Sequence, residues 1–380
     1  MNTVTIEKRN NIGIIRFAIP NTAMNVLNKE TLADLNEAVD QVIADETLIG
    51  GIFTGSKSSF CAGADIKEMQ AIGHELKHLS HDEKVARLAI MIKNMTNFFR
   101  KIETAPKSFV AAINGVALGG GYEFCLACHY RIASDNPKIK IGLAEAKIGL
   151  LPGAGGTQRL PRLIGIQNAL QLMIEGKVLP APKAKEKGLI NDCVPADELI
   201  NKAIAWITEN PTAKQPWDQP FYTIPGGDLN NPMTGQIMAI GNAMMMDKSH
   251  GNYIGIKLIM QSVYEGSQIS FDNAMKVEEK CFIKCLMHPH TLRMLTTVFV
   301  SNQALSKGAR RPQEVPQSPI TKIAILGGGG FMGSGIGYVA ACAGIKVVLI
   351  DLTDDSLNKG IQHCTSLLDK QITRKKITET

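Results

Sequence analysis

The stretch Asn114-Gly-Val-Ala-Leu-Gly-Gly-Gly-Tyr-Glu-Phe-Cys125 lies between an apolar run typical of a buried strand, Phe109–Ile113, and a helical pattern. Its three consecutive glycines, Gly119–Gly121, stand where strand would pass into helix. Glycine lets the backbone approach a ligand closely, and the first N–H groups of a helix have no partner within it. We therefore expect this turn to stabilise a carbonyl oxygen that becomes negative during a reaction, with the carboxylate of Glu123 one turn away. A glycine turn that serves only close packing is the alternative.

A second loop of small residues, Phe60-Cys-Ala-Gly-Ala-Asp-Ile66, also runs into a helix. Its backbone N–H groups could approach a ligand as those of the first glycine loop could. An oxyanion hole made of two peptide N–H groups needs two such loops. Whether the two loops meet in space is left to the structure.

A third stretch, Leu143–Arg159, carries an isolated carboxylate, Glu145, and then a glycine turn that opens another helix. Glu145 follows apolar residues and has no evident structural task. Burial would raise the pKa of its side chain, which is the property that a proton donor requires. An exposed loop glutamate is the alternative.

Size and composition are those of an ordinary globular protein of two or three domains. The chain has 380 residues, of which 44% are hydrophobic and 20% charged. The net charge of +6 is mild and aromatic residues are sparse, which argues against nucleic acid and suits a small anionic ligand. Eight scattered cysteines favour a reduced, cytoplasmic protein, and the N-terminal segment is no signal or transit sequence. No apolar run is long enough to span a membrane.

Three patterns resemble metal sites, and we expect none of them to bind a metal. His74-Glu-Leu-Lys-His78 fits H-E-x-x-H, but its surroundings are highly charged, and a zinc protease needs a third ligand and an enclosing cleft. Cys125-Leu-Ala-Cys128 has no second CxxC, so we expect one cysteine to pack into the core. His288 and His290 flank a proline after a helix, where cap and surface positions are expected.

Periodicity and turn residues predict the elements that carry these loops. The expected elements are a β-hairpin over Val4–Phe17 with its turn at Asn10–Asn11, helices over Asn28–Asp45 and Val85–Lys101, strands over Ile49–Thr54 and Ser108–Ile113, and short strand-like pieces at Arg131–Ser134 and Lys140–Gly142. Prolines then predict stiff linkers over Asn210–Gly227 and Arg310–Pro319, with mostly helical structure over Gly235–Gly308 between them.

Three blocks occur in one order: Ala62-Gly-Ala-Asp-Ile66, Asn114–Glu123, and Glu145 followed by Pro152-Gly-Ala-Gly-Gly-Thr-Gln-Arg159. In this combination the chain resembles the crotonase (enoyl-CoA hydratase/isomerase) superfamily over about residues 1–200. The resemblance implies an α/β fold, the crotonase-like ββα superhelix with spiral turns. It also implies an acyl-CoA thioester as substrate.

The resemblance assigns roles to single residues. The peptide N–H groups of Ala64 and Gly120 would hold the thioester carbonyl oxygen, and Glu123 and Glu145 would be the two catalytic carboxylates of a hydratase. Adding water to a double bond conjugated with a thioester builds an enolate-like oxyanion, so fixed donors lower the barrier. One carboxyl group would deprotonate the water and the other would protonate Cα. Which glutamate is the acid and which the base stays open.

Further implications concern the substrate and the cofactor. Hydration needs neither cofactor nor metal, and the presence of both glutamates favours a hydratase over an enzyme that only isomerises the double bond. The substrate-binding positions implied by the resemblance are Ala23, Met24, Asn25, Ala62, Gly63, Asp65 and Ile66.

Lys322–Gly333 combines a strand with a G-x-G-x-x-G pattern at Gly328, Gly330 and Gly333. A helix over Ser334–Ala343 and a second strand, which ends at Asp351, follow. The acidic residue stands about twenty positions after the glycines, where it can bind the ribose hydroxyls of NAD. Its charge would repel the 2′-phosphate of NADP, so we predict an NAD site.

The order of a crotonase region, a helical region and an NAD fingerprint is similar to the α-subunit family of fatty-acid β-oxidation complexes. The predicted domains are therefore residues 1–200 (hydratase), 201–319 (mostly helical linker region) and 320–380 (the first βαβ of a Rossmann domain, incomplete). In that family the second part is a 3-hydroxyacyl-CoA dehydrogenase and the partner is a thiolase β subunit, while a homo-oligomer is the alternative assembly. Because one βαβ opening is not an independently stable domain, we expect a fragment or truncated product without hydride transfer.

Other function classes stay open at this point. The chain could be an NAD-dependent dehydrogenase half that uses its first region only for assembly. It could also be a non-catalytic acyl-CoA-binding scaffold for a thiolase. Δ3-Δ2-enoyl-CoA isomerase activity could accompany hydration, because both reactions protonate Cα.

Overall fold

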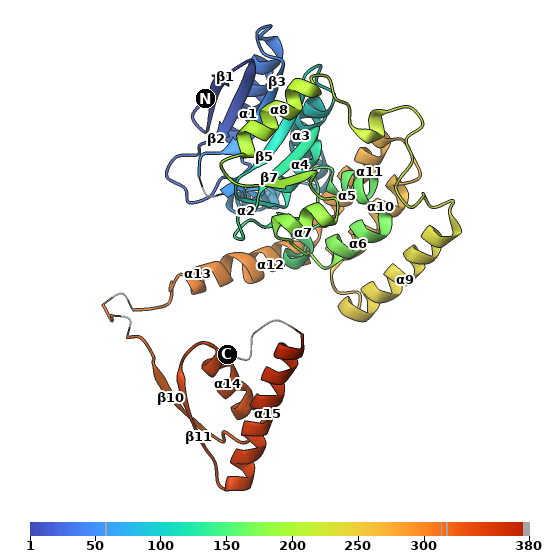
Figure 1. Ribbon diagram of the computed structural model, residues 1–380. Coiled ribbons are helices and arrows are strands. Elements are labelled where there is room, and N and C mark those ends of the chain that lie inside the picture. Colours follow the sequence, from blue (N-terminus) through green and yellow to red (C-terminus); the bar gives the residue numbers. More distant parts are fainter. Residues whose placement is uncertain (58, 313, 317, 375–380) are drawn as a thin grey trace. The chain divides into compact units, whose positions relative to one another are not determined.

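The computed structural model describes residues 1–57, 59–312, 314–316 and 318–374 (Figure 1). The chain divides into two units, Met1–Lys307 and Gly308–Thr380, and each is described by itself. The bounds of the three predicted domains, which end at residues 200, 319 and 380, stay a prediction.

The first unit opens with the predicted β-hairpin. Strand β1 (Val4–Arg9) pairs antiparallel with β2 (Ile12–Phe17), and Asn10 takes a positive φ of 50° at the turn. Asparagine tolerates this conformation better than most residues, which is why the turn falls there. Helix α1 (Lys29–Ala44) follows, with the Asn28 side chain accepting the Thr31 N–H as its N-terminal cap.

Three successive turns of the chain each contribute one strand to a large sheet and one to a small sheet. The large sheet has the order β1-β2-β3-β5-β7-β9 and is parallel except for its first pair, and the small sheet has the order β4-β6-β8. The further strands are β3 (Gly50–Gly55), β4 (Ser59–Cys61), β5 (Ser108–Ile113), β6 (Val116–Leu118), β7 (Tyr130–Ser134), β8 (Ile141–Gly142) and β9 (Asp192–Val194).

Helical segments close each turn. They are α2 (Ile66–Glu75), η1 (Leu76–His78) and α3 (His81–Glu103) after β4, α4 (Gly120–Ala127) after β6, and η2 (Glu145–Ile148) after β8. This arrangement is a ββα superhelix, so the predicted fold class is confirmed.

Helix α4 forms the centre of the core. The Phe124 ring lies 4.7 to 5.6 Å from those of Phe53, Phe17 and Phe99 in edge-to-face contacts. Cys125 within α4 and Cys128 at its C-terminal cap are both buried, because the helix is surrounded by other elements, whereas one core cysteine was expected. On the other face of the large sheet lies α8 (Leu199–Glu209), as Figure 1 shows.

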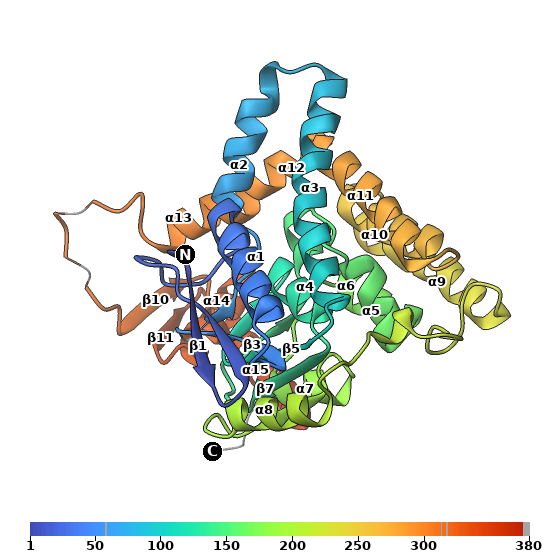
Figure 2. The same ribbon diagram turned by 90° about the horizontal axis from the view of Figure 1, so that it is seen from above.

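The helices that follow pack onto the same unit. Figure 2 shows α10 and α11 beside α5 and α3. The segment predicted as a stiff linker, Asn210–Gly227, is also held by tertiary contacts: the buried Gln215 amide donates to the carbonyls of residues 126–128, and Trp217 stacks on Phe271. The elements are α5 (Gly156–Ile164), α6 (Ile166–Ile174), α7 (Ala181–Glu186), η3 (Pro216–Asp218), α9 (Pro232–Ser249), α10 (Ile254–Gly266), α11 (Phe271–Met287), α12 (Pro289–Met294), the π-helical η4 (Leu295–Ser301) and α13 (Asn302–Ser306).

The second unit contains the predicted βαβ opening. Strand β10 (Lys322–Leu326) pairs in parallel with β11 (Lys346–Ile350), and α14 (Phe331–Cys342) connects them; α15 (Asp354–Thr373) follows. Helix α14 begins at Phe331, three residues before the expected start. Apolar side chains of both strands, such as Leu326 and Ile350, are exposed in this unit.

Candidate active site

The two small-residue loops meet in space. A Cβ atom added to Gly63 would lie 3.5 Å from the Gly120 nitrogen, and one added to Gly120 would lie 3.5 Å from the Ala64 nitrogen. The predicted oxyanion donors, Ala64 and Gly120, are therefore neighbours, although 56 positions separate them in the chain. Both residues are only partly buried.

Each of these two N–H groups is left available by the local backbone. Gly120 is the first residue of α4, so its N–H has no acceptor within the helix. Ala64 forms a parallel bridge with Leu27 in which Gly63 O and Asp65 N make the hydrogen bonds. The N–H of the central residue of such a bridge points to the opposite side. Gly119, with φ +52°, provides the sharp entry into α4.

Glu123 lies one turn into α4 and is 2% exposed. Its Oε1 accepts hydrogen bonds of 2.7 Å from the N–H groups of Ala154 and Gly156. Burial raises the pKa of the carboxyl to about 7, although these two N–H groups and Arg159 oppose the shift. A carboxyl with a raised pKa suits proton transfer near neutral pH.

Glu145 begins η2 and points its carboxylate at the first glycine loop. A Cβ atom on Gly119 would lie 2.9 Å from Oε1 of Glu145. Its Oε2 is buried and has no hydrogen-bond partner. Burial first, and the charge of Glu123 second, raise the pKa of Glu145 well above its usual value. Hydration would need a proton donor close to the oxyanion donors. The unpartnered carboxyl oxygen of Glu145 lies on that side of the first glycine loop.

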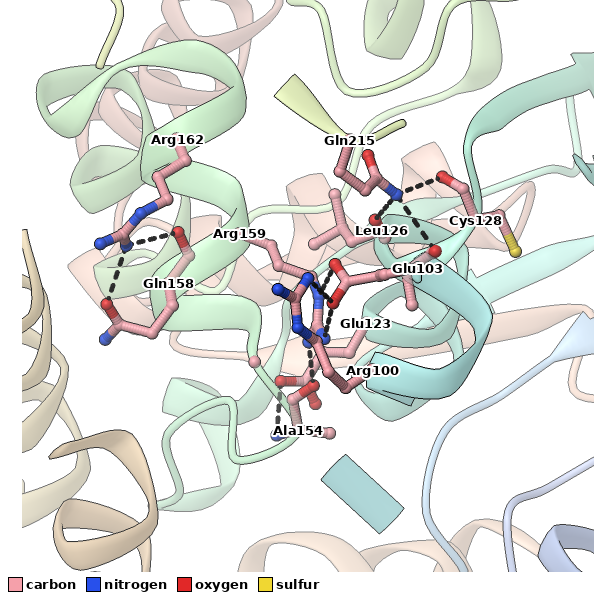
Figure 3. Close-up of polar contacts among 12 residues, drawn as sticks. Arg100, Glu103, Glu123, Leu126, Cys128, Ala154, Gln158, Arg159, Arg162 and Gln215 are labelled. Carbon is pink, nitrogen blue, oxygen red and sulfur yellow. Dashed lines mark hydrogen bonds and ion pairs between the residues drawn. The ribbon is translucent and has the colours of Figure 1, made fainter. Parts of the chain in front are cut away.

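A buried ion pair supports the loop that holds Glu123. The guanidinium of Arg159 donates to both carboxylate oxygens of Glu103, at 2.7 and 2.9 Å, and to the carbonyl of Ala154 at 2.6 Å. Figure 3 shows Arg159 between Glu103 and Ala154, with Glu123 next to them. Arg159 therefore links the Ala154 carbonyl, in the loop that donates to Glu123, to the end of α3.

The predicted substrate-binding positions differ in their surroundings. Ala23 and Met24 are exposed, whereas the Asn25 side chain is buried and donates to the carbonyls of Ser59 and Phe60. Asp65 caps α2 by accepting the Lys67 N–H. Contact of these positions with a substrate stays a prediction; the visible task of Asn25 is to attach its loop to β4.

The sequence reading missed one buried carboxylate of this region, Glu278 of α11. It is 1% exposed and accepts hydrogen bonds from the N–H groups of Gly155 and Thr157. A signal was present, because Glu278 falls on the apolar face formed by Ala274, Cys281 and Cys285. A charged residue at such a position is buried only when it is paired or hydrogen-bonded.

The two histidine patterns lie in other elements than those that carry Glu123 and Glu145. The two histidines of His74–His78 fall in different segments, since α2 ends at Glu75 and η1 continues to His78. His288 caps α12. Among the described residues no group of three His, Cys, Asp or Glu side chains could hold a metal ion. Within the same residues no helix has the length and hydropathy that crossing a membrane requires.

The second unit has the local geometry of a dinucleotide-binding turn. A Cβ atom on Gly333 would lie 2.1 Å from the Gly327 carbonyl, so this position requires glycine. Asp351 directly follows β11 and accepts the Gly329 N–H at 2.8 Å. Hydrogen bonds from Leu352 and Gly329 lower the pKa of Asp351, which keeps it charged. These residues fit a bound NAD.

Both units of the chain match families of known proteins. Residues 7–215 match the family model "Enoyl-CoA hydratase/isomerase", and residues 322–380 match "3-hydroxyacyl-CoA dehydrogenase, NAD binding domain". The chain is 33% identical over 386 residues to the fatty acid oxidation complex subunit alpha of Acinetobacter baylyi. This alignment covers 99% of the chain and 51% of the relative, so the chain spans about half the length of that relative.

Solved structures show the same fold. The human mitochondrial delta3-delta2-enoyl-CoA isomerase matches with a TM-score of 0.55 and 21% identity, covering 80% of this chain and 100% of that one. An enoyl-CoA hydratase from Bacillus halodurans matches with a TM-score of 0.54 and 21% identity, covering 78% and 99%. With the family model matching more than half of its length, the chain belongs to the enoyl-CoA hydratase/isomerase family and carries part of an NAD-binding domain in its second unit.

Proposed function

We propose that the chain hydrates 2-trans-enoyl-CoA to 3-hydroxyacyl-CoA. The observation that carries this proposal is the meeting of the Ala64 and Gly120 N–H groups beside two carboxyl groups of raised pKa, Glu123 and Glu145. The donors would hold the thioester oxygen, which becomes negative in the transition state.

The different surroundings of the two carboxyl groups support a division of roles. Glu123, whose ionised form is favoured by the N–H groups of Ala154 and Gly156, takes a proton from water as the oxygen bonds to Cβ. The double-bond electrons move toward the thioester and form the enolate. Glu145, kept protonated by burial, then gives its proton to Cα. Glu123 then releases its proton to solvent and Glu145 takes one up, which restores both carboxyl groups.

The second unit supports a role for this reaction in a longer reaction sequence. We propose that the chain takes part in fatty-acid β-oxidation, because its relative is named as the alpha subunit of a fatty acid oxidation complex. The product of hydration carries the hydroxyl group that a 3-hydroxyacyl-CoA dehydrogenase oxidises, with NAD as hydride acceptor. In this chain Gly328, Gly330, Gly333 and Asp351 would hold the dinucleotide. A thiolase partner and a cytoplasmic location stay predictions.

The test is hydration of a 2-trans-enoyl-CoA, followed by the loss of absorbance of the conjugated thioester. Glu145→Gln and Glu123→Gln are each expected to lower kcat by about 10²- to 10⁴-fold with little change in KM. Glu186→Gln, an exposed position on α7, is the control.

Two outcomes would contradict the proposal. Near-parental turnover in Glu145→Gln would remove its mechanism. Tight acyl-CoA binding without any turnover of the parent chain would favour the scaffold instead. Isomerisation is tested by offering a 3-enoyl-CoA in the same assay. Moving its double bond next to the thioester creates a conjugated product and so raises the absorbance.

A further inference from the structure

The segment Ala154–Thr157 lies between two buried carboxylates that come from distant parts of the chain. The N–H groups of Ala154 and Gly156 donate to Glu123 of α4, each at 2.7 Å. The N–H groups of Gly155 and Thr157 donate to Glu278 of α11, at 2.5 and 2.9 Å. Four consecutive N–H groups therefore alternate between the two acids.

Further contacts hold Glu278 in this place. Its Oε2 also accepts the Thr157 hydroxyl at 2.5 Å, and that hydroxyl lies 2.7 Å from the hydroxyl of Ser262 on α10. Gly155 takes a φ of +103°, and a Cβ atom there would lie 1.6 Å from Nη1 of Arg159. The turn is thus shaped by glycine and fixed on the side opposite to Glu123.

We propose that Glu278 is a positioning residue for hydration, which holds Gly155 and Thr157 so that the N–H groups of Ala154 and Gly156 keep Glu123 in its reactive orientation. The inference rests on the proposed hydratase function. Glu278 lies beyond residues 7–215, so the helices after the family match complete the active site of this chain.

The charged and titratable groups that act on Glu278 come from several elements. Burial raises its pKa to about 8, and the charge of Glu123 adds to the shift, while Thr157, Gly155 and Arg159 oppose it. Glu145 and Cys281 also interact with it electrostatically. The ionised form of Glu123 is favoured by its two hydrogen bonds from the loop. If Glu278 no longer held the loop, Glu123 would lose these hydrogen bonds and its ionised form would be less stable.

The first experiment is a double-mutant cycle on hydration. Glu278→Gln is expected to lower kcat about tenfold or more with KM within about twofold, and to change kcat by less than about twofold in the Glu123→Gln background. Glu279→Gln, its neighbour on α11 whose carboxylate lies 3.9 Å from the Lys93 ammonium, should match the parent. Effects that multiply in the double variant would mean an independent structural role and would overturn the proposal.

A second variant covers the case in which Glu278→Gln does not fold. Thr157→Val removes the hydroxyl that Glu278 accepts while keeping the side-chain size, and Thr157→Ser restores it. A lower kcat in Thr157→Val that Thr157→Ser recovers supports the proposal, and equal rates in the two variants overturn it.

A third measurement does not depend on turnover. The Glu123 carboxyl is titrated by NMR of chain labelled with ¹³C at glutamate Cδ, with Glu123→Gln assigning its signal. In Thr157→Val, which leaves the Glu278 carboxylate in place, the Glu123 midpoint is expected to rise by about 0.5 pH units or more. A midpoint that stays or falls rejects the positioning role, whereas absent hydration by the parent chain with a shifted midpoint rejects only the hydratase function.

Discussion

Gly120 and Gly121 are adjacent and chemically identical, yet their surroundings give them different tasks. A Cβ atom on Gly120 would meet the Ala64 nitrogen at an ordinary contact distance of 3.5 Å, in the space before the two donors. A Cβ atom on Gly121 would lie 2.3 Å from the Cys61 carbonyl, well inside contact distance. Gly120 would keep room for a ligand under the proposed function, and Gly121 lets α4 pack against β4.

We therefore expect Gly120→Ala to lower kcat/KM for hydration by about 10²-fold, because it obstructs the oxyanion donors, with a change in unfolding free energy below about 1 kcal/mol. Gly121→Ala is expected to destabilise the chain by about 1–3 kcal/mol through overpacking. Urea unfolding and hydration kinetics of both variants check this. Equal losses of stability would show that the space beside Gly120 has no special role.

At the scale of elements, α10 reaches the segment after Glu145 through a glycine. A Cβ atom on Gly255 would lie 2.4 Å from the Leu150 carbonyl, and Leu150 N donates to the carbonyl of Glu145. Helix α10 thus packs directly on the backbone that carries the proposed acid. Gly235 of α9 offers a contrast, because nothing lies within 4 Å of its added Cβ atom.

The same substitution should have opposite effects at these two positions. Gly255→Ala is expected to cost about 1–3 kcal/mol, since a backbone carbonyl must move. Gly235→Ala is expected to stabilise the chain by about 0.5–1 kcal/mol through helix propensity. Denaturant midpoints of the two variants and the parent chain test this prediction. Stabilisation by both substitutions would mean that α10 does not pack closely on Leu150.

At the scale of the molecule, the proposed hydratase residues all lie in the first unit. Glu123, Glu145 and Glu278 belong to Met1–Lys307, and so do the two oxyanion donors. The family match, in contrast, ends at residue 215. Helices α10 and α11, which follow that point, supply core residues and the Glu278 carboxylate.

A chain of residues 1–307 is therefore expected to hydrate 2-trans-enoyl-CoA at about the parental rate. A chain of residues 1–215 should fold poorly, because the apolar surface of α5 and α6 and the buried Arg159 region would lose their cover. Expression, circular dichroism and the hydration assay test both chains. Full activity of the shorter chain would contradict the structural role given to the later helices.

The buried acids also make stability depend on pH. The pKa values of Glu123 and Glu278, about 7 and about 8, exceed the ordinary value of 4.5. Between these limits the unfolded chain has released protons that the folded chain retains, so stability falls as pH rises. Burial lowers the pKa of His129 to about 4, which has the opposite effect, but only below about pH 6.5.

We expect the free energy of unfolding to fall by about 1 kcal/mol or more between pH 6.5 and 8, with a smaller slope in Glu278→Gln. Both tryptophans, Trp206 and Trp217, lie in the first unit, so their fluorescence reports its unfolding alone. A slope that is the same in Glu278→Gln would show that this carboxyl ionises normally in the folded chain.

Local patterns were enough to predict many single elements, whereas the ββα fold itself was implied by the resemblance to a family. The hairpin at Asn10–Asn11, the glycine entry into α4 and the βαβ unit of residues 322–350 all depend on interactions between near neighbours in the chain. Backbone conformation and apolar periodicity are short-range properties, so the sequence carries them openly. The three motif blocks added the family.

Contacts between distant residues could not be predicted in this way. Glu278 and Gly155 are separated by 123 positions, and Arg159 and Glu103 by 56, so only packing of the helices brings them together. The pKa of a carboxyl depends on how completely its neighbours exclude water, which no local pattern states. The sequence alone determines which groups are available for the chemistry, and the tertiary fold determines which of them are buried together.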